Sequence, residues 1–183
     1  VGPRRERVQW NRVELFWIDE RAVPPQHPDS NFGGAQRALI EPLAISTERV
    51  HRMRGELPVD EAARLYDEEL RRLASGGLDL ALIGIGADGH IASLFPGSSA
   101  LAESRALAAA VSGPDGRPRI TMTPVALALA RSILVLARGA EKASAVSRAL
   151  DPLGPELPAR LAACPRAFWV LDQAAAALLP RPG

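Results

Sequence analysis

Several features that would place the chain in a particular class of protein are missing from the sequence. Its 22 lysine and arginine residues nearly balance its 21 acidic residues, and the formal net charge at pH 7 is +1. This balance gives no electrostatic reason to expect binding to nucleic acid or to an anionic membrane surface. No apolar run approaches the roughly 20 residues that a membrane-spanning helix needs. These absences argue against a nucleic-acid-binding protein and against a membrane protein.

Cysteine and lysine each occur once. Cys164 is the only cysteine, so a disulfide within the chain and a cluster of thiolate metal ligands are both excluded. The opening stretch, VGPRRERVQW, has no apolar leader core, and we expect a reducing, cytoplasmic setting. Lys142 is the only lysine in a chain whose other basic residues are all arginine. An isolated lysine against that background is a candidate for a specific role.

Motifs for common cofactors are also missing. The chain has no Walker loop and no paired-histidine zinc motif. Gly84, Gly86 and Gly89 have the GxGxxG spacing of a dinucleotide-binding loop. However, His90 follows at once, and no acidic residue stands out as a ribose ligand. Dinucleotide binding is therefore the lesser interpretation, and no cofactor or metal is predicted.

What the sequence does contain is organised around one stretch, LDLALIGIGADGHIASLFP, from Leu78 to Pro96. Residues 78–85 are almost wholly apolar, which predicts a parallel strand buried on both faces. A glycine-rich loop with Asp88 and His90 follows, and residues 91–95 are expected to begin a helix. Ligands of open α/β sheets gather at the carboxyl ends of strands, so this loop predicts an acid/base site. The alternative is a glycine turn whose aspartate caps a helix and whose histidine is merely solvated.

Strand and helix patterns alternate along the chain, and 183 residues are enough for one domain with a sizeable core. We expect a single α/β domain, 1–183, with a mostly parallel Rossmann-like sheet and helices on both faces. The expected strands are 12–18, 49–53, 78–85, 107–111, 119–123, 132–137 and 168–171. The expected helices are 32–43, 59–74, 125–130, 141–150, 157–163 and 172–179.

Charged residues follow the first of these strands. Asp19, Glu20 and Arg21 lie directly after the apolar stretch 12–18, and they form either a solvated turn or part of a site. His27 lies among prolines and is expected on the surface. Asn31 closes the stretch 29–31, which offers capping side chains to the next helix.

Taken together, four segments resemble the 6-phosphogluconolactonase family. They are Asp19-Glu20-Arg21-Ala22-Val23-Pro24, Pro28-Asp29-Ser30-Asn31, Gly84 to Pro96 (GIGADGHIASLFP), and Pro118-Arg119-Ile120-Thr121 with the turn from Gly139 to Lys142. Their order and spacing match the family over nearly the whole chain, and the third segment is highly specific.

The resemblance implies a fold and a reaction, and it also shows one point at which this sequence differs from the family. The family hydrolyses 6-phospho-D-glucono-1,5-lactone to 6-phosphogluconate in the oxidative pentose phosphate pathway, on a fold shared with glucosamine-6-phosphate deaminases and isomerases, and without a metal. Its members usually open with a strand and a Ser-Gly-Gly-Ser-Thr-Pro phosphate-binding loop, whereas this sequence begins after that point. Loss of that segment would leave a hydrophobic slot, through which we expect association.

The resemblance also implies roles for particular residues. His90 is expected to take the proton from the water that attacks the lactone carbonyl, with Asp88 orienting it. Arg21, Arg119 and Lys142 are expected to hold the substrate phosphate. Three further residues are expected to contact the substrate or shape its cleft: Asp19, Asn31 and Gly86.

Two other interpretations stay open. The first is a glucosamine-6-phosphate deaminase or isomerase. The similar loop of those enzymes continues into Asn-Glu-Pro, whereas the equivalent stretch here is Ser93-Leu94-Phe95-Pro96, which has no acid. The second is a non-catalytic or truncated relative that binds sugar phosphates or scaffolds a partner. A small-molecule sugar-phosphate lactone remains the expected ligand, with no nucleic acid and no membrane.

Overall fold

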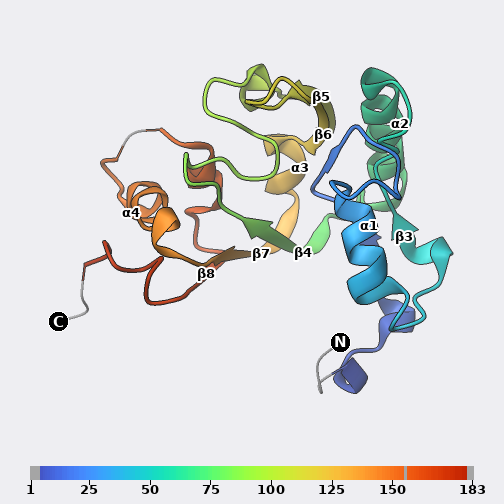
Figure 1. The fold of residues 1–183 in the computed structure, drawn as a ribbon, viewed down its shortest axis with the longest axis horizontal. Coiled ribbons are helices and arrows are strands. Elements are labelled where there is room, and N and C mark those ends of the chain that lie inside the picture. Colours follow the sequence, from blue (N-terminus) through green and yellow to red (C-terminus); the bar gives the residue numbers. More distant parts are fainter. Residues whose placement is uncertain (1–4, 155, 181–183) are drawn as a thin grey trace.

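The computed structural model describes residues 5–154 and 156–180, and it shows a mixed α/β fold (Figure 1). The strands are β1 (Leu15–Phe16), β2 (Asp19–Arg21), β3 (Val50–His51), β4 (Leu78–Gly84), β5 (Ala108–Ser112), β6 (Pro118–Met122), β7 (Ala130–Ala137) and β8 (Ala167–Leu171). The α-helices are α1 (Asn31–Ala35), α2 (Val59–Leu73), α3 (Pro124–Ala128) and α4 (Ala143–Leu150). None of the described helices is long and apolar enough to cross a membrane.

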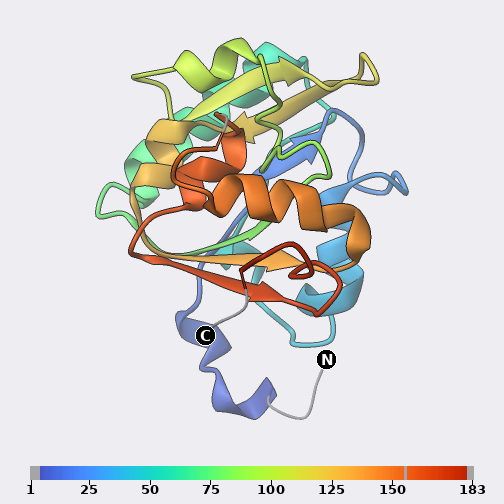
Figure 2. The same ribbon diagram turned by 90° about the vertical axis from the view of Figure 1, so that its left-hand side faces the viewer.

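The parallel sheet has the order β4-β7-β8, and it carries the glycine-rich loop at the end of β4. Its three strands are predominantly apolar, as parallel strands usually are. Figure 2 shows α4 lying across one side of these strands. On that side Ala81, Ile83, Ile133 and Val135 are almost fully buried.

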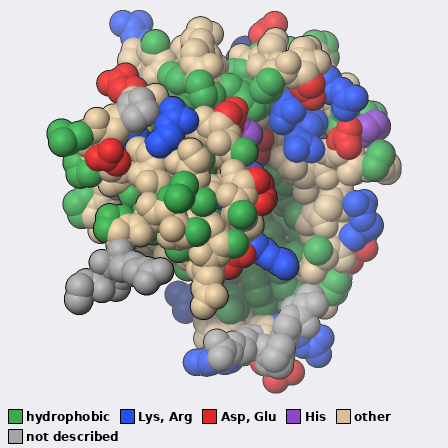
Figure 3. Space-filling model, turned by 60° about the vertical axis from the view of Figure 1, so that its left-hand side comes forward, with side chains coloured by type: hydrophobic (Ala, Val, Ile, Leu, Met, Phe, Trp, Pro, Cys, Tyr) green, Lys and Arg blue, Asp and Glu red, His purple; other side chains and the backbone are tan. Residues whose placement is uncertain are grey.

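The other face of this parallel sheet is open. Alternate residues point to it, and the large apolar ones remain exposed: Leu80 (53%), Leu82 (56%), Leu136 (49%), Phe168 (63%) and Val170 (53%). We call these five side chains the open face. Figure 3 likewise shows hydrophobic side chains at the floor of a hollow on the surface it draws. The prediction that residues 78–85 are buried on both faces is therefore wrong for one face.

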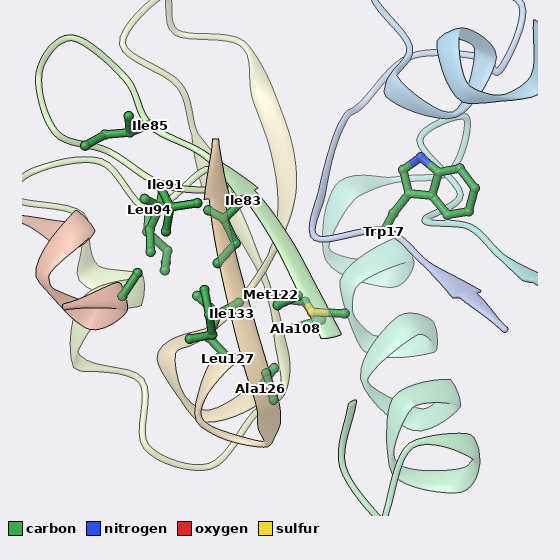
Figure 4. Close-up of a cluster of buried hydrophobic side chains, with 14 of the residues drawn as sticks. Trp17, Ile83, Ile85, Ile91, Leu94, Ala108, Met122, Ala126, Leu127 and Ile133 are labelled. Atoms are coloured by element: carbon green, nitrogen blue, oxygen red, sulfur yellow. The ribbon is translucent and has the colours of Figure 1, made fainter. Parts of the chain in front are cut away.

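A second sheet is antiparallel, with the order β2-β6-β5, and helix α2 packs against β5 and β6. A third, of two short parallel strands, pairs β1 with β3. The main core lies between the sheets and their helices, where Figure 4 shows Ile83, Ile91, Leu94, Leu127 and Ile133 close together, with Trp17 standing apart near α1 and α2.

Several expected elements are corrected by the structure. The strand expected over 12–18 shrinks to β1, and the charged triplet after it is itself a strand, β2, because it pairs with β6. The helix expected over 32–43 is α1 followed by a π-helical segment, Gln36–Ile40. Residues 91–95 form a tight turn rather than a helix. The closing helix expected over 172–179 is a series of turns.

Candidate active site

The imidazole of His90 and the carboxylate of Asp88 form the centre of the candidate site, on the loop that follows β4. The Nδ1 of His90 lies 2.6 Å from Oδ1 of Asp88, and the backbone N–H of His90 donates to the same oxygen over 3.2 Å. Burial pushes the pKa of Asp88 upward, but the hydrogen bonds and positive charge that His90 supplies outweigh it, so that the pKa lies below its ordinary value. Asp88 is therefore ionised at neutral pH and can only accept, which places a proton on Nδ1 of His90.

Two further groups enclose the His90 ring. Gly86 lies directly against it, because a Cβ atom added there would overlap Nδ1 and Cε1 of the ring and lie 2.5 Å from Oδ1 of Asp88. The ring of Phe95 lies 4.6 Å away between ring centroids, tilted by 50°. With Nδ1 occupied by Asp88, the free nitrogen is Nε2, and 31% of the His90 side chain remains exposed. The arrangement presents a lone pair on Nε2 to solvent, as a general base requires.

A buried serine, Ser93, anchors the turn that follows His90. Leu94 donates its backbone N–H to the carbonyl of Ile91 over 2.9 Å, and Ala92 between them has a φ of +53°. Such a φ is unfavourable for an L-residue with a side chain. Ser93 is fully buried, and its hydroxyl donates to Oδ2 of Asp19 over 2.7 Å. This bond, between residues 74 positions apart, ties the base-bearing loop to β2.

Asp19 and Asn31 form the rest of that connection. The side-chain amide of Asn31 donates to the carbonyl of Asp19 over 2.9 Å and to its Oδ1 over 3.2 Å. Both carboxylate oxygens of Asp19 are thus used within the protein. The structure brings these two predicted residues together beside the His90 loop, where they organise the framework.

Glu20, which the sequence did not single out, joins β2 to helix α1. Its buried carboxylate accepts the backbone N–H groups of Asn31 and Phe32, each over 2.7 Å. It also accepts the hydroxyl of Ser30 over 3.1 Å and the N–H of Arg21 over 2.9 Å. Four hydrogen bonds satisfy the oxygens of a carboxylate whose burial would otherwise be costly. The carboxylate therefore fixes the start of α1 against β2.

Arg21 and Arg119 lie directly opposite each other on the antiparallel strands β2 and β6. Like charges in this position repel each other, and hydrogen bonds to neighbouring residues offset that repulsion only in part. Arg21 donates to the carbonyl of Asp29 over 2.8 Å, and Arg119 donates to Asp115 over 3.3 Å. The Nε atoms of both arginines are buried and have no partner among the described residues. Buried donors of this kind call for an acceptor, and both arginines line a cavity of about 530 Å³.

Arg119 is connected to the base through one aromatic ring. The guanidinium carbon of Arg119 lies 5.4 Å from the centroid of the Phe95 ring, which itself contacts His90. Lys142 ends a 3₁₀ turn (Ala140–Lys142) directly after β7, the neighbour of β4 in the parallel sheet. Lys142 and His90 therefore follow neighbouring strands at the carboxyl edge of that sheet. The Lys142 side chain makes no hydrogen bond or ion pair with any part of the chain that the structure describes.

Sequence reasoning did not assign roles to Glu20, Ser93 and Phe95. Glu20 was considered only as one of three charges after a strand, and the buried contacts of Ser93 and Phe95 arise between elements distant in sequence. A small polar residue inside the apolar run from Ile91 to Phe95 was the one available signal for Ser93.

Comparison with known proteins gives consistent relatives. Residues 2–170 match the family described as "Glucosamine-6-phosphate isomerases/6-phosphogluconolactonase". The chain is 36% identical over 198 residues to a 6-phosphogluconolactonase of Streptomyces coelicolor, covering 98% of this chain and 75% of the relative. It is 37% identical over 196 residues to a 6-phosphogluconolactonase of Mycobacterium tuberculosis, with coverage of 98% and 78%.

The fold has close counterparts among solved structures. The crystal structure of 6-phosphogluconolactonase from Thermotoga maritima superposes with a TM-score of 0.81 at 32% sequence identity, covering 90% of this chain and 74% of that one. The α/β fold class predicted from the sequence is thereby confirmed.

Proposed function

The chain belongs to the glucosamine-6-phosphate isomerase/6-phosphogluconolactonase family, and from this premise we propose that His90 is the base in its reaction. The reaction is hydrolysis of 6-phospho-D-glucono-1,5-lactone to 6-phosphogluconate, the activity supported by relatives that carry the name 6-phosphogluconolactonase and match nearly the whole chain. The observation that carries the proposal is the pair of His90 and Asp88, because the 2.6 Å contact at Nδ1 leaves Nε2 as the basic nitrogen.

The chemistry of a lactone matches this pair. Nε2 of His90 accepts a proton from water as the water oxygen bonds to the carbonyl carbon, C1 of the sugar. The tetrahedral intermediate then collapses, the bond between C1 and the ring oxygen breaks, and the imidazolium returns its proton to that oxygen. Asp88, ionised, stabilises the imidazolium and keeps the ring oriented between the two proton transfers. No redox partner is consumed.

The phosphate of the substrate would lie on the arginine side of the site. Arg21 and Arg119 offer buried Nε donors that have no partner within residues 5–154 and 156–180, and charge-assisted bonds from guanidinium groups to phosphate are strong and directional. An anion between the two guanidinium groups would also relieve their cross-strand repulsion. Lys142, at the carboxyl edge of the parallel sheet, would add a third positive charge. Asp19, Asn31 and Gly86 would shape the cleft around the sugar.

The deaminase alternative has less support in this site. Among the described residues, Asp88 is the one carboxylate that contacts His90, and the position after Leu94 holds an apolar ring, Phe95. Release of ammonia from glucosamine 6-phosphate would decide for the deaminase. A thermal shift with sugar phosphates but without turnover would favour a non-catalytic relative.

The decisive experiment follows hydrolysis of freshly generated 6-phosphogluconolactone by the 183-residue chain, over the spontaneous rate, with His90→Ala as control. We expect an excess rate that His90→Ala reduces by at least about 100-fold, as loss of a general base does. Tm should change little, since the side chain is partly exposed. A variant that keeps near-normal turnover would remove His90 from this role.

A further inference from the structure

Phe95 contacts both the base and an arginine of the site. Its ring centroid lies 4.6 Å from that of His90 and 5.4 Å from the guanidinium carbon of Arg119. The residue is 7% exposed, so both contacts are made almost out of water. An aromatic ring attracts a cation near its face, and more strongly when water is excluded.

The turn that carries Phe95 has little freedom to move. It begins at His90 and passes through Ala92, whose φ is +53°, and through the fully buried Ser93. Ser93 is anchored twice, by its hydroxyl to Asp19 over 2.7 Å and by its N–H to Oγ1 of Thr121 over 3.2 Å. Thr121 lies on β6, the strand that also carries Arg119. The ring is thus held by the same framework as the arginine.

The His90 ring needs this second support. Asp88 fixes the position of Nδ1 but leaves the ring plane free to tilt about that hydrogen bond. Gly86 bounds the ring at Nδ1 and Cε1, and the Phe95 ring packs against it as well. Misplacing a reacting group by about 1 Å can cost about 100-fold in rate, so a ring that sets the direction of Nε2 has consequences for turnover.

We propose that Phe95 is a positioning residue that holds the His90 imidazole and the Arg119 guanidinium in fixed relation, so that Nε2 and the phosphate-binding side of the site engage one substrate together. This inference rests on the proposed lactonase function. It goes beyond it by assigning a role in catalysis to a buried apolar residue that takes no part in proton transfer. Phe95 acts through its two neighbours, His90 and Arg119.

The test compares Phe95→Leu, which keeps an apolar side chain but removes the ring, with Phe95→Tyr, which restores the ring. For Phe95→Leu we expect kcat to fall about 10-fold, equal to about 1.4 kcal/mol in activation free energy, and KM to rise at the same time. Phe95→Tyr should recover most of both. The control is Ile133→Val, a small truncation of a fully buried core residue in β7, which should leave kcat and KM unchanged.

A second measurement needs no turnover. Diethyl pyrocarbonate modifies accessible imidazole nitrogens, and peptide mass spectrometry follows each histidine separately, with the exposed His27 as internal reference. Release of the His90 ring in Phe95→Leu should raise its modification rate several-fold relative to His27, while Ile133→Val should not. Binding of inorganic phosphate, measured by calorimetry, should weaken in Phe95→Leu because Arg119 loses its support.

The outcomes separate the two proposals. If the parent chain shows no lactonase activity, the proposed function fails, and modification and phosphate binding still judge Phe95. If the parent chain is active and Phe95→Leu matches it in kcat, KM and His90 modification, the role of Phe95 is overturned while the lactonase stands. A loss that Phe95→Tyr does not recover in a folded protein would also overturn it.

Discussion

Substitution of Gly86 by alanine is the most direct test of the geometry around His90. The added Cβ would overlap Nδ1 and Cε1 of His90 and would lie 2.5 Å from Oδ1 of Asp88. Non-bonded carbon contacts are comfortable at about 3.5 Å or more, so the carboxylate must retreat by about 1 Å and the ring must leave its place. A displacement of that size in a catalytic group costs about 100-fold in rate. We therefore expect kcat/KM for the lactone to fall about 100-fold.

The same substitution should be mild for folding. Gly86 does not have a positive φ, so alanine can adopt its backbone conformation. His90 is partly exposed and can swing outward. The matched control is Gly84→Ala, two residues earlier at the end of β4, where an added Cβ meets nothing within 4 Å.

The assay follows lactone hydrolysis over the spontaneous rate, with Tm measured for each protein. Activity in Gly86→Ala within a few-fold of the parent would refute the enclosed geometry of His90. An equal loss of activity in Gly84→Ala would show that the effect is not specific to the contact with His90.

Three further predictions address other parts of the site. Lys142→Ala should raise KM for the lactone with little change in kcat, because a phosphate contact supports ground state and transition state equally. Steady-state kinetics measures both constants, and an unchanged KM would contradict a role of Lys142 in binding. Glu20→Gln replaces one of two oxygens that together accept four donors. Urea denaturation should show that this substitution lowers the free energy of unfolding by about 3 kcal/mol. The control, Glu68→Gln in an exposed ion pair, should lower it by about 0.5 kcal/mol or less. Asp88 has a pKa held below its ordinary 3.8 by His90, against the upward effect of burial, so its ionised form stabilises the fold above pH 3.8 and that contribution is lost as pH falls through the lowered pKa. Acid titration of the unfolding free energy should therefore be shallower in Asp88→Asn, and identical curves would argue against the Asp88–His90 contact.

The sequence predicted those elements whose own composition determines them. The apolar runs of β4, β7 and β8 and the amphipathic pattern of α2 were sufficient, and their bounds were close to those observed. The Asp88–His90 loop was placed correctly because a strand that ends in glycines has few alternatives. Each of these signals lies within one short stretch of the sequence.

The elements that were mispredicted depend on contacts between distant residues. β2 consists of three charged residues with no strand signal, and it exists because it pairs with β6 and because Glu20 binds the start of α1. Residues 91–95 have the composition of a helix, but Ser93 is drawn into the core towards Asp19 and the turn closes instead. The open face was likewise hidden, since an apolar run does not reveal which of its faces is covered. Association through the uncovered surface stays a prediction.

The position of β4 in its sheet also affects how the base is held over time. Among the described residues, β4 pairs with β7 on one side and with no strand on the other, so half of its inter-strand amides lack a strand partner. Segments of that kind open locally more often than strands flanked on both sides. His90 lies just beyond the end of β4, and its orientation therefore depends on a strand at the edge of this sheet, where amides are less protected against hydrogen exchange than in the central strand β7. Any partner bound along that edge would slow amide hydrogen exchange in β4. Because His90 follows β4, the same partner would keep the imidazole in its catalytic orientation for a larger fraction of the time.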